Sequence, residues 1–236
     1  MLTLHVIIMK NLIRIAKITL QFKNTLFLNL ERYSCPLIGG NVSKGPKLSI
    51  TMTVLGTIPS GKAIVRSGAR TGDGIYVTGS LGDAKGGLEV LRSGKKQDYL
   101  VSRYCHPTPR IEEGKALREL ASSMIDVSDG LLADLGHLCS ASNLGAELDI
   151  SSLPISSHLK EEVGEELAYK FALSDSDDYE LCFTIPKRLE DEMKRRDRIS
   201  LAPVTKIGTM TPGNNIKVLS EDGKTIEIEQ LGYKHF

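Results

Sequence analysis

Hydrophobic and polar residues alternate most clearly between residues 47 and 55. The apolar residues occupy every second position, and lysine, serine or threonine lies between them: Leu48, Ile50, Met52 and Val54. Because successive side chains of a strand point to opposite faces, this pattern predicts a half-buried strand. Gly56 and the turn residues 59–61 end it, so we place a domain boundary after residue 58.

Beyond this boundary, strand-like and helix-like patterns alternate along the chain. Apolar alternation predicts strands near residues 73–79, 146–155 and 179–185, and a hairpin near 216–229. Helical spacing predicts helices at about 84–91, 111–123, 161–173 and 187–196, and another after Gly130. The alternation predicts an α/β or mixed α+β class. We therefore expect a partial N-terminal domain over 1–58 and a C-terminal α/β domain over 59–236.

Residues 1–30 are apolar and basic, with no acidic residue. Their apolar positions fit neither the strand nor the helix period. Lys10, Arg14, Lys17 and Lys23 interrupt the apolar run, which argues against a signal peptide or a membrane span. We expect a segment that is buried or covered by a partner, with a basic amphipathic surface helix as the alternative.

Composition narrows the function classes. The chain has 236 residues and a net charge of +1, so no strong field attracts it to nucleic acid or a membrane. Four cysteines lie far apart without a C-x-x-C pair, which predicts neither a zinc site nor a redox motif. Unpaired thiols are typical of a reducing compartment, so we expect a cytoplasmic protein.

The candidate chemistry centres on the run from Met124 to Asp134, which reads M-I-D-V-S-D-G-L-L-A-D. It presents Asp126, Ser128 and Asp129 just before an apolar helical stretch. Carboxylates in that setting suit Mg²⁺, which takes oxygen ligands and usually also binds substrate phosphates. The alternative is a helix cap, because Ser or Asp before a helix satisfies free backbone N–H groups.

A second candidate is the strand, glycine loop and helix start between residues 73 and 84. This order is the geometry that holds phosphates at a helix N-terminus, although it matches neither the P-loop nor the dinucleotide-binding spacing. Such turns are often purely structural.

Several motifs occur together in a fixed order from about Glu31 to Phe236. They are L-I-G-G, R-S-G-A-R-x-G-D, Y-V-T-G-S-L-G-D, I-D-V-S-D-G-L-x-x-D-L, D-Y-E-L-C-F and G-Y-K-H-F. In this order they resemble the thiamine-monophosphate kinase family, which belongs to the aminoimidazole ribonucleotide synthetase-like fold. The resemblance implies ATP-dependent phosphorylation of thiamine monophosphate to thiamine diphosphate. It also implies an N-terminal domain that forms a homodimer through strands, with the nucleotide bound between the two domains.

The resemblance also implies roles for individual residues. The Mg²⁺ ligands would be Asp126 and Asp129. The positions that contact ATP would be Gly40, Asn41, Arg66 and Ser128. The positions that contact thiamine monophosphate would be Asp177 and Tyr233.

From the residues alone, most of these positions have a structural alternative. Arg66 would then be a solvated surface charge, as arginine usually is. Asp177 and its acidic neighbours would cap a loop and strand, and Tyr233 would belong to ordinary C-terminal packing. Asp134 is expected to be a surface or supporting group.

The chain departs from the family pattern in three places. No counterpart of the family's further metal-binding aspartates and substrate-contacting histidine occurs before Leu37, so the chain resembles a truncated or altered member. Asn41 replaces an aspartate, which removes a negative charge. Asp175-Ser176-Asp177 replaces Gly-Gly-Glu. Two hypotheses remain: an active kinase, or a catalytically impaired fragment that retains a nucleotide-binding or dimerisation domain.

Overall fold

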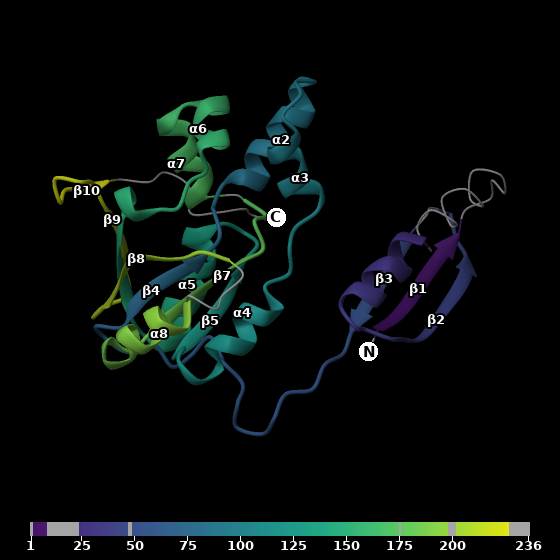
Figure 1. Cartoon of the computed structure of the whole chain (residues 1–236), viewed down its shortest axis with the longest axis horizontal. Helices are drawn as coiled ribbons and strands as arrows, with labels where there is room; N and C mark the ends of the chain where they lie inside the picture. The colour runs from purple at the N-terminus through teal and green to yellow at the C-terminus, as the bar shows by residue number, and fades with distance from the viewer. Residues whose placement is uncertain (1, 9–23, 47–48, 175, 198–201, 227–236) are drawn as a thin grey trace. The chain divides into compact units, whose positions relative to one another are not determined.

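The computed structural model describes residues 2–8, 24–46, 49–174, 176–197 and 202–226. The chain divides into two compact units, Met1–Ser60 and Gly61–Phe236, which we call unit 1 and unit 2 (Figure 1). This division falls close to the boundary expected after residue 58.

Unit 1 contains a three-stranded sheet in the order β2-β1-β3. The strands are β1 (Leu2–Ile8), β2 (Leu37–Lys44) and β3 (Ser49–Val54). β1 pairs parallel to β2 and antiparallel to β3. Residues 24–32, between the two parallel strands, are helical, as parallel pairing requires a crossover connection. The strand at β1 was not predicted, because its apolar run was read together with the basic residues that follow it.

The strand predicted near residues 47–55 is confirmed as β3, but its predicted half-burial is wrong. Every position of β3 is exposed. Ile50, Met52 and Val54 are 38%, 55% and 70% exposed. The alternating pattern therefore marks an apolar strand face that unit 1 itself leaves open to solvent.

Unit 2 is built on a seven-stranded sheet in the order β10-β9-β6-β8-β4-β7-β5. Neighbouring strands are antiparallel except β6 and β9, which are parallel. The strands are β4 (Gly74–Thr78), β5 (Ser123–Val127), β6 (Gly145–Asp149), β7 (Glu180–Ile185), β8 (Val204–Thr211), β9 (Ile216–Leu219) and β10 (Thr225–Ile226). The predicted mixed α/β class is confirmed.

Seven α-helices in the described part of unit 2 accompany this sheet. They are α2 (Asp83–Ser93), α3 (Asp98–Cys105), α4 (Ile111–Ala116), α5 (Leu131–Ser142), α6 (Ser157–Val163), α7 (Glu165–Leu173) and α8 (Glu190–Asp197). The helix predicted over 111–123 is too long, because a 3₁₀ turn follows α4 and leads into β5. The helix predicted over 161–173 is two helices, separated at Gly164 (φ 82°). Helix α3 and strand β8 were not predicted.

The sheet of unit 2 is packed on both faces. Along β7, Cys182 belongs to a core that includes Leu135, while Phe183 belongs to a second core that includes Tyr76. A third cluster joins Leu100 to the helices α2, α6 and α7 (Figure 1). Burial on both faces fixes the register of β7, and with it the loop that precedes this strand.

Helices α2 and α3 approach each other at Gly87. A Cβ atom on Gly87 would lie 2.1 Å from the carbonyl oxygen of Leu100. Gly136, in the middle of α5, has only the Ile216 side chain at 3.9 Å from such an atom. The two glycines therefore test steric packing against helix propensity.

We expect Gly87→Ala to destabilise the protein by about 1–3 kcal/mol, because the added methyl group overpacks the helix contact. Gly136→Ala is the matched control and should stabilise by about 0.5–1 kcal/mol through helix propensity. Urea unfolding followed by circular dichroism measures both free energies of unfolding. Equal effects of the two substitutions would contradict the close approach of α2 and α3.

The N-terminus of α2 is capped by a carboxylate from a distant part of the chain. The backbone N–H groups of Gly82 and Ala84 donate to the two carboxylate oxygens of Asp178, at 2.6 and 3.0 Å. Asp178 is 2% exposed. Burial raises the pKa of Asp178 to about 6, against the opposing effect of these hydrogen bonds.

This shift gives a pH-dependent contribution to stability. Because the folded-state pKa is raised, the native state holds the Asp178 proton more tightly than the unfolded state. The contribution is therefore complete below pH 4 and is lost as the pH rises through about 6. Relative to Asp178→Asn, the free energy of unfolding of the wild type should fall by at most about 3 kcal/mol over this window. A constant difference between the two proteins in urea unfolding from pH 4 to 7 would contradict this assignment.

Candidate functional site

A segment over residues 64–73 runs along β5, the edge strand of the unit 2 sheet. The N–H of Met124 in β5 donates to the carbonyl oxygen of Val65 at 3.1 Å. The hydroxyl of Ser142 on α5 donates to the carbonyl oxygen of Arg66 at 3.3 Å. Gly68 is required here, because a Cβ atom would lie 2.5 Å from the Ser122 carbonyl oxygen and φ is 141°. These contacts fix the backbone of Arg66 while its side chain remains exposed.

An open hollow of about 580 Å³ lies between this segment and β5. Its lining is mostly apolar, with Arg66, Ser67 and Asp126 as the polar contributors: Ile64, Val65, Arg66, Ser67, Met124, Ile125, Asp126, Ala141 and Leu181. The structure thus brings two of the predicted site residues, Arg66 and Asp126, to one hollow. A guanidinium and a carboxylate above an apolar floor suit a ligand with both a flat apolar part and an anionic part.

The D-x-S-D loop follows β5 directly. Asp126 is exposed, Val127 is buried, and Ser128 and Asp129 are half-buried before α5 begins. The N-cap residue of α5 is Gly130 (φ 103°), and no side chain caps the helix there. The alternative in which Ser128 or Asp129 is the helix cap is therefore wrong.

Asp134 holds the loop from within. The backbone N–H groups of Ser128 and Asp129 donate to one oxygen of Asp134, at 2.9 and 3.0 Å. Asp134 is 3% exposed, so its predicted place at the surface is wrong and its role as a supporting group is observed. Burial raises the pKa of Asp134, and these two hydrogen bonds oppose that rise. Asp134 therefore occupies the backbone donors of the loop, in which Asp126 is exposed and Asp129 half-buried.

The loop before β7 lies beside this loop. Asp126 pairs with Leu181 and Val127 with Glu180 across the two strands. The Tyr179 N–H donates to the Val127 carbonyl oxygen at 2.8 Å. Asp177 and Tyr179 are exposed, and their neighbours in sequence are buried.

The charges of nearby carboxylates contribute to the raised pKa of the Tyr179 phenol. Its pKa is raised first by burial and then by the negative charges of Asp177, Asp126 and Asp129. Three of the residues predicted from the sequence therefore act on one side chain.

The buried residue Glu180 fixes the other side of this loop. It is 1% exposed and accepts hydrogen bonds from Arg110 at 2.6 Å on both carboxylate oxygens and from Arg103 at 2.8 Å. The Thr78 hydroxyl donates a further hydrogen bond to Glu180 at 2.6 Å. The sequence analysis missed these residues, because the partners of Glu180 lie 70 to 102 positions away along the chain.

The glycine loop before α2 does not hold a phosphate group in the way that the second candidate suggested. Asp178 accepts the hydrogen bonds from the helix N-terminus, and the Lys85 N–H donates to the buried Ser176 hydroxyl at 3.4 Å. Gly79 is needed for a different reason, since a Cβ atom would lie 2.2 Å from Glu180 and φ is 60°. The loop therefore packs against residues 178–180 (D-Y-E) and binds them through its backbone N–H groups.

The acidic residues of the site offer at most part of a metal-binding set. Among the described residues, no three His, Cys, Asp or Glu side chains come together as a complete metal-binding group. Mg²⁺ is commonly held by one or two carboxylates, with substrate phosphates and water completing its six ligands. The carboxylates of Asp126 and Asp129 have the donor chemistry for such a partial set.

The remaining predicted residues lie elsewhere or outside the described part. Gly40 and Asn41 are exposed on β2 of unit 1, where Asn41 is the register partner of His5. Tyr233 and Asp175 lie outside the described residues. Their predicted roles stay predictions.

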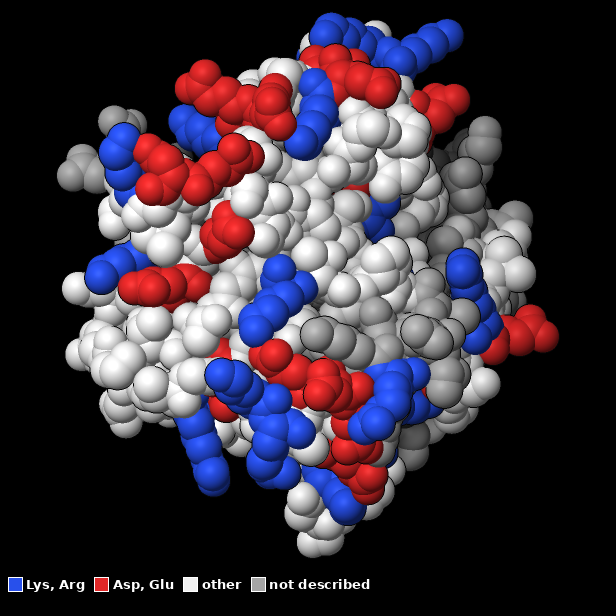
Figure 2. Space-filling model, turned by 60° about the vertical axis from the view of Figure 1, so that its left-hand side comes forward, with Lys and Arg blue, Asp and Glu red and all other residues white. Residues whose placement is uncertain are grey.

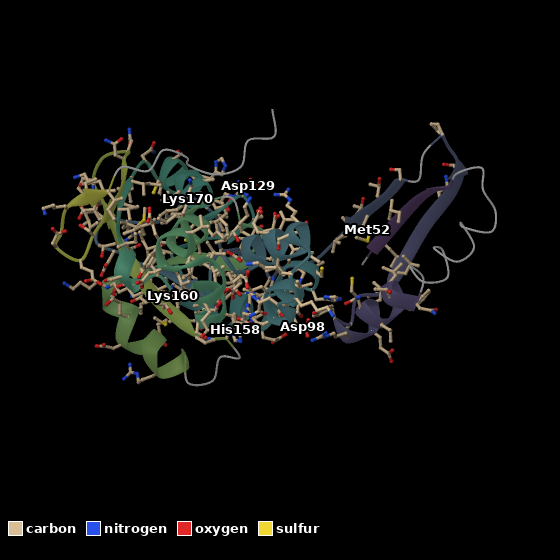
Figure 3. The ribbon with its side chains drawn as sticks, turned by 90° about the horizontal axis from the view of Figure 1, so that it is seen from above. Met52, Asp98, Asp129, His158, Lys160 and Lys170 are labelled. Carbon is tan, nitrogen blue, oxygen red and sulfur yellow. The ribbon has the colours of Figure 1, made fainter. Side chains whose placement is uncertain are left out.

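Charge on the surface is mixed. Figure 2 shows Lys and Arg interspersed with Asp and Glu on one face. In unit 2, Figure 3 shows Asp129 on the opposite side from His158 and Lys160. None of the helices that the structure describes has the length and apolar character to cross a membrane.

Comparison with known proteins adds the family. The sequence model described as AIR synthase related protein, C-terminal domain, matches residues 70–221. Thiamine-monophosphate kinase of Escherichia coli (strain K12) is 43% identical over 221 residues, which cover 91% of this chain and 68% of the relative. That share exceeds the span from Glu31 to Phe236, so the similarity extends further toward the N-terminus than the motifs indicated.

Solved structures agree with this match. The crystal structure of thiamine-monophosphate kinase from Stenotrophomonas maltophilia K279a is 36% identical, with a TM-score of 0.85 over 95% of this chain and 72% of the other. A structure described as AaThiL complexed with AMPPCP and TMP is 30% identical, with a TM-score of 0.81 over 100% of this chain and 73% of the other. The chain belongs to the thiamine-monophosphate kinase family.

Proposed function

We propose that this chain transfers the terminal phosphate of ATP to thiamine monophosphate, giving thiamine diphosphate and ADP. Membership of the kinase family supports the reaction class. The related structure with AMPPCP and TMP supports the substrate pair, because AMPPCP is an ATP analogue with an uncleavable β–γ bridge. The observation that carries the proposal to this chain is the hollow shared by Arg66 and Asp126.

The chemistry requires positioning more than acid–base catalysis. An oxygen of the thiamine monophosphate phosphate attacks the γ-phosphorus of ATP, and the bond to the β-phosphate oxygen breaks. The attacking oxygen is already anionic at neutral pH, so no general base is needed. The obstacle is the repulsion between two phosphate groups, which catalysis overcomes by holding them in line and neutralising their charge.

In the proposed site, different residues of the chain bind ATP and thiamine monophosphate. Arg66 faces the ATP phosphates, and Ser128 contacts ATP from the loop after β5. Gly40 and Asn41 on unit 1 contribute further ATP contacts. Asp177 and Tyr233 contact thiamine monophosphate.

Asp126 and Asp129 hold Mg²⁺ in this proposal. A bound Mg²⁺ would neutralise phosphate charge at the reacting centre. Arg66 is the cation of the hollow, so the two carboxylates need a divalent ion before a polyphosphate can approach them. The charge balance of the site thus supports the binding of Mg²⁺.

The exposed strand face of unit 1 supports a homodimer as the working form. Ile50, Met52 and Val54 project from β3, and an apolar strand with open edges or faces is unfavourable in water. We also propose a cytoplasmic location, which is consistent with four unpaired cysteines.

The direct test mixes the folded chain with ATP, thiamine monophosphate and Mg²⁺ and follows thiamine diphosphate by chromatography. Product above that of a heat-inactivated sample supports the kinase. Binding of ATP without transfer would reject it in favour of the catalytically impaired alternative. The replacement of an aspartate by Asn41 is the specific reason to consider that alternative.

We expect Asp126→Asn and Asp129→Asn each to lower kcat/KM at least about 100-fold, because the lost charge weakens phosphate neutralisation. Both variants should also need a higher Mg²⁺ concentration for half-maximal rate. Asp98→Asn, an exposed aspartate at the start of α3, is the control and should leave both quantities unchanged. An unaltered Mg²⁺ dependence in both site variants would contradict the metal assignment.

We expect Met52→Lys to weaken self-association, because it places a charge in the middle of the apolar face of β3 (Figure 3). Leu91→Lys, at a residue of α2 that is 47% exposed, is the control. Sedimentation velocity over a range of protein concentrations measures the dissociation constant. A wild type that stays monomeric, or a variant with the same dissociation constant, would contradict the role of this face.

A further inference from the structure

The side chain of Tyr179 faces solvent although an aromatic ring of this size usually gains by burial. It is 45% exposed, whereas Tyr76 and Phe183, the aromatic residues within the described strands of the unit 2 sheet, are buried. Its exposure therefore needs a cause in the surrounding structure.

The backbone holds the ring in this position. Tyr179 has a φ of 53°, in the left-handed region that bulky residues seldom adopt and that the surrounding structure must enforce. The enforcing contacts lie on both sides. Asp178 is fixed to the N-terminus of α2, and Glu180 is fixed to Arg103 and Arg110. The Tyr179 N–H is bonded to Val127 at 2.8 Å.

The ring is also next to the candidate site. The Tyr179 N–H donates to the carbonyl oxygen of Val127, the residue that follows Asp126, so Tyr179 lies beside the start of the D-x-S-D loop. The phenol senses the charges of Asp177, Asp126 and Asp129. An exposed aromatic face beside Asp177, a carboxylate outside the proposed metal-binding loop, attracts a flat cation.

We infer that Tyr179 is a specificity-determining residue that stacks on the cationic thiazolium ring of thiamine monophosphate. This inference rests on the proposed function. Of the two proposed substrates, thiamine monophosphate has a permanent organic cation, in a planar ring that fits an aromatic face. ATP has no such group. In this arrangement Tyr179 binds the thiazolium end, and Arg66 and the metal-binding loop face the phosphates.

Two substitutions distinguish the effect of the Tyr179 ring from the effect of its backbone conformation. Tyr179→Phe keeps the aromatic face and should keep the wild-type KM for thiamine monophosphate. Tyr179→Asn removes the ring while favouring the same left-handed backbone. It should raise the KM for thiamine monophosphate about 3- to 30-fold, the size of a cation–π contact, and leave the KM for ATP unchanged.

A neutral substrate isolates the cation. An analogue with a thiophene in place of the thiazolium has the same shape without the charge. Its KM should exceed that of thiamine monophosphate with the wild type, and Tyr179→Asn should change it less than about 2-fold. An unchanged KM for thiamine monophosphate in Tyr179→Asn, or an equal rise for both substrates, would overturn the inference.

Calorimetric titration with thiamine monophosphate separates this inference from the proposed reaction. Weaker binding to Tyr179→Asn than to the wild type and Tyr179→Phe supports the stacking role even if the wild type shows no turnover, which would reject the kinase activity alone. Turnover by the wild type with equal binding to all three proteins would reject the stacking role alone.

Discussion

The buried carboxylate of Glu180 is the constraint on which the candidate site depends. It joins the end of β4, helix α3, the segment before α4 and the start of β7 through Thr78, Arg103 and Arg110. A buried charge is costly unless it is fully hydrogen-bonded, and here a guanidinium contacts both of its oxygens. Removing one partner would leave the others buried without compensation. The start of β7 is therefore held in one position, and the loop before it inherits that position.

This constraint also explains features of the sequence that otherwise suggest ligand binding. Gly79 and Gly82 both have positive φ, and a Cβ atom at either would meet Glu180 or the backbone of α7 at less than 3 Å. The glycines in the loop before α2 thus make room for the D-Y-E segment. The Asp178 carboxylate takes the place at the helix N-terminus that an anionic ligand would occupy. An internal anion and an external one compete for the same donors, and here the internal one is bound.

Local pattern predicted the elements whose packing is simple. Strands β3 and β4 show clear apolar alternation or runs, and each was found within a few residues. Helix α3 was missed because Leu100 is its one fully buried residue, so its eight residues carry no apolar stripe. Strand β8 was missed because Gly208 interrupts it. That glycine is needed where a Cβ atom would lie 2.2 Å from the Glu147 carbonyl oxygen, a contact between strands that one sequence does not reveal.

The candidate site shows the same division. The acidic motif predicted Asp126 and Asp129 as candidates, because carboxylates near a helix start are visible in sequence. Its supporting groups were not visible, since Glu180 and Arg103 are 77 positions apart and Asp134 resembles a surface residue on its helix. Family resemblance supplied Asp177, but neither the motif nor the spacing indicated that Tyr179 would be forced outward beside it.

Charge decides how such a surface can bind two anionic substrates. Asp126, Asp129 and Asp177 act together on Tyr179, and Arg66 is the cation that lines the hollow with Asp126. In the proposed function, a metal ion beside Asp126 and Asp129 lets the phosphates approach, whereas a cationic ring approaches Asp177 directly. The inferred orientation of thiamine monophosphate follows from this difference, with its ring toward Tyr179 and its phosphate toward Arg66. In the proposed site, Asp126 and Asp129 bind the metal ion, and Asp177 and Tyr179 bind the organic cation.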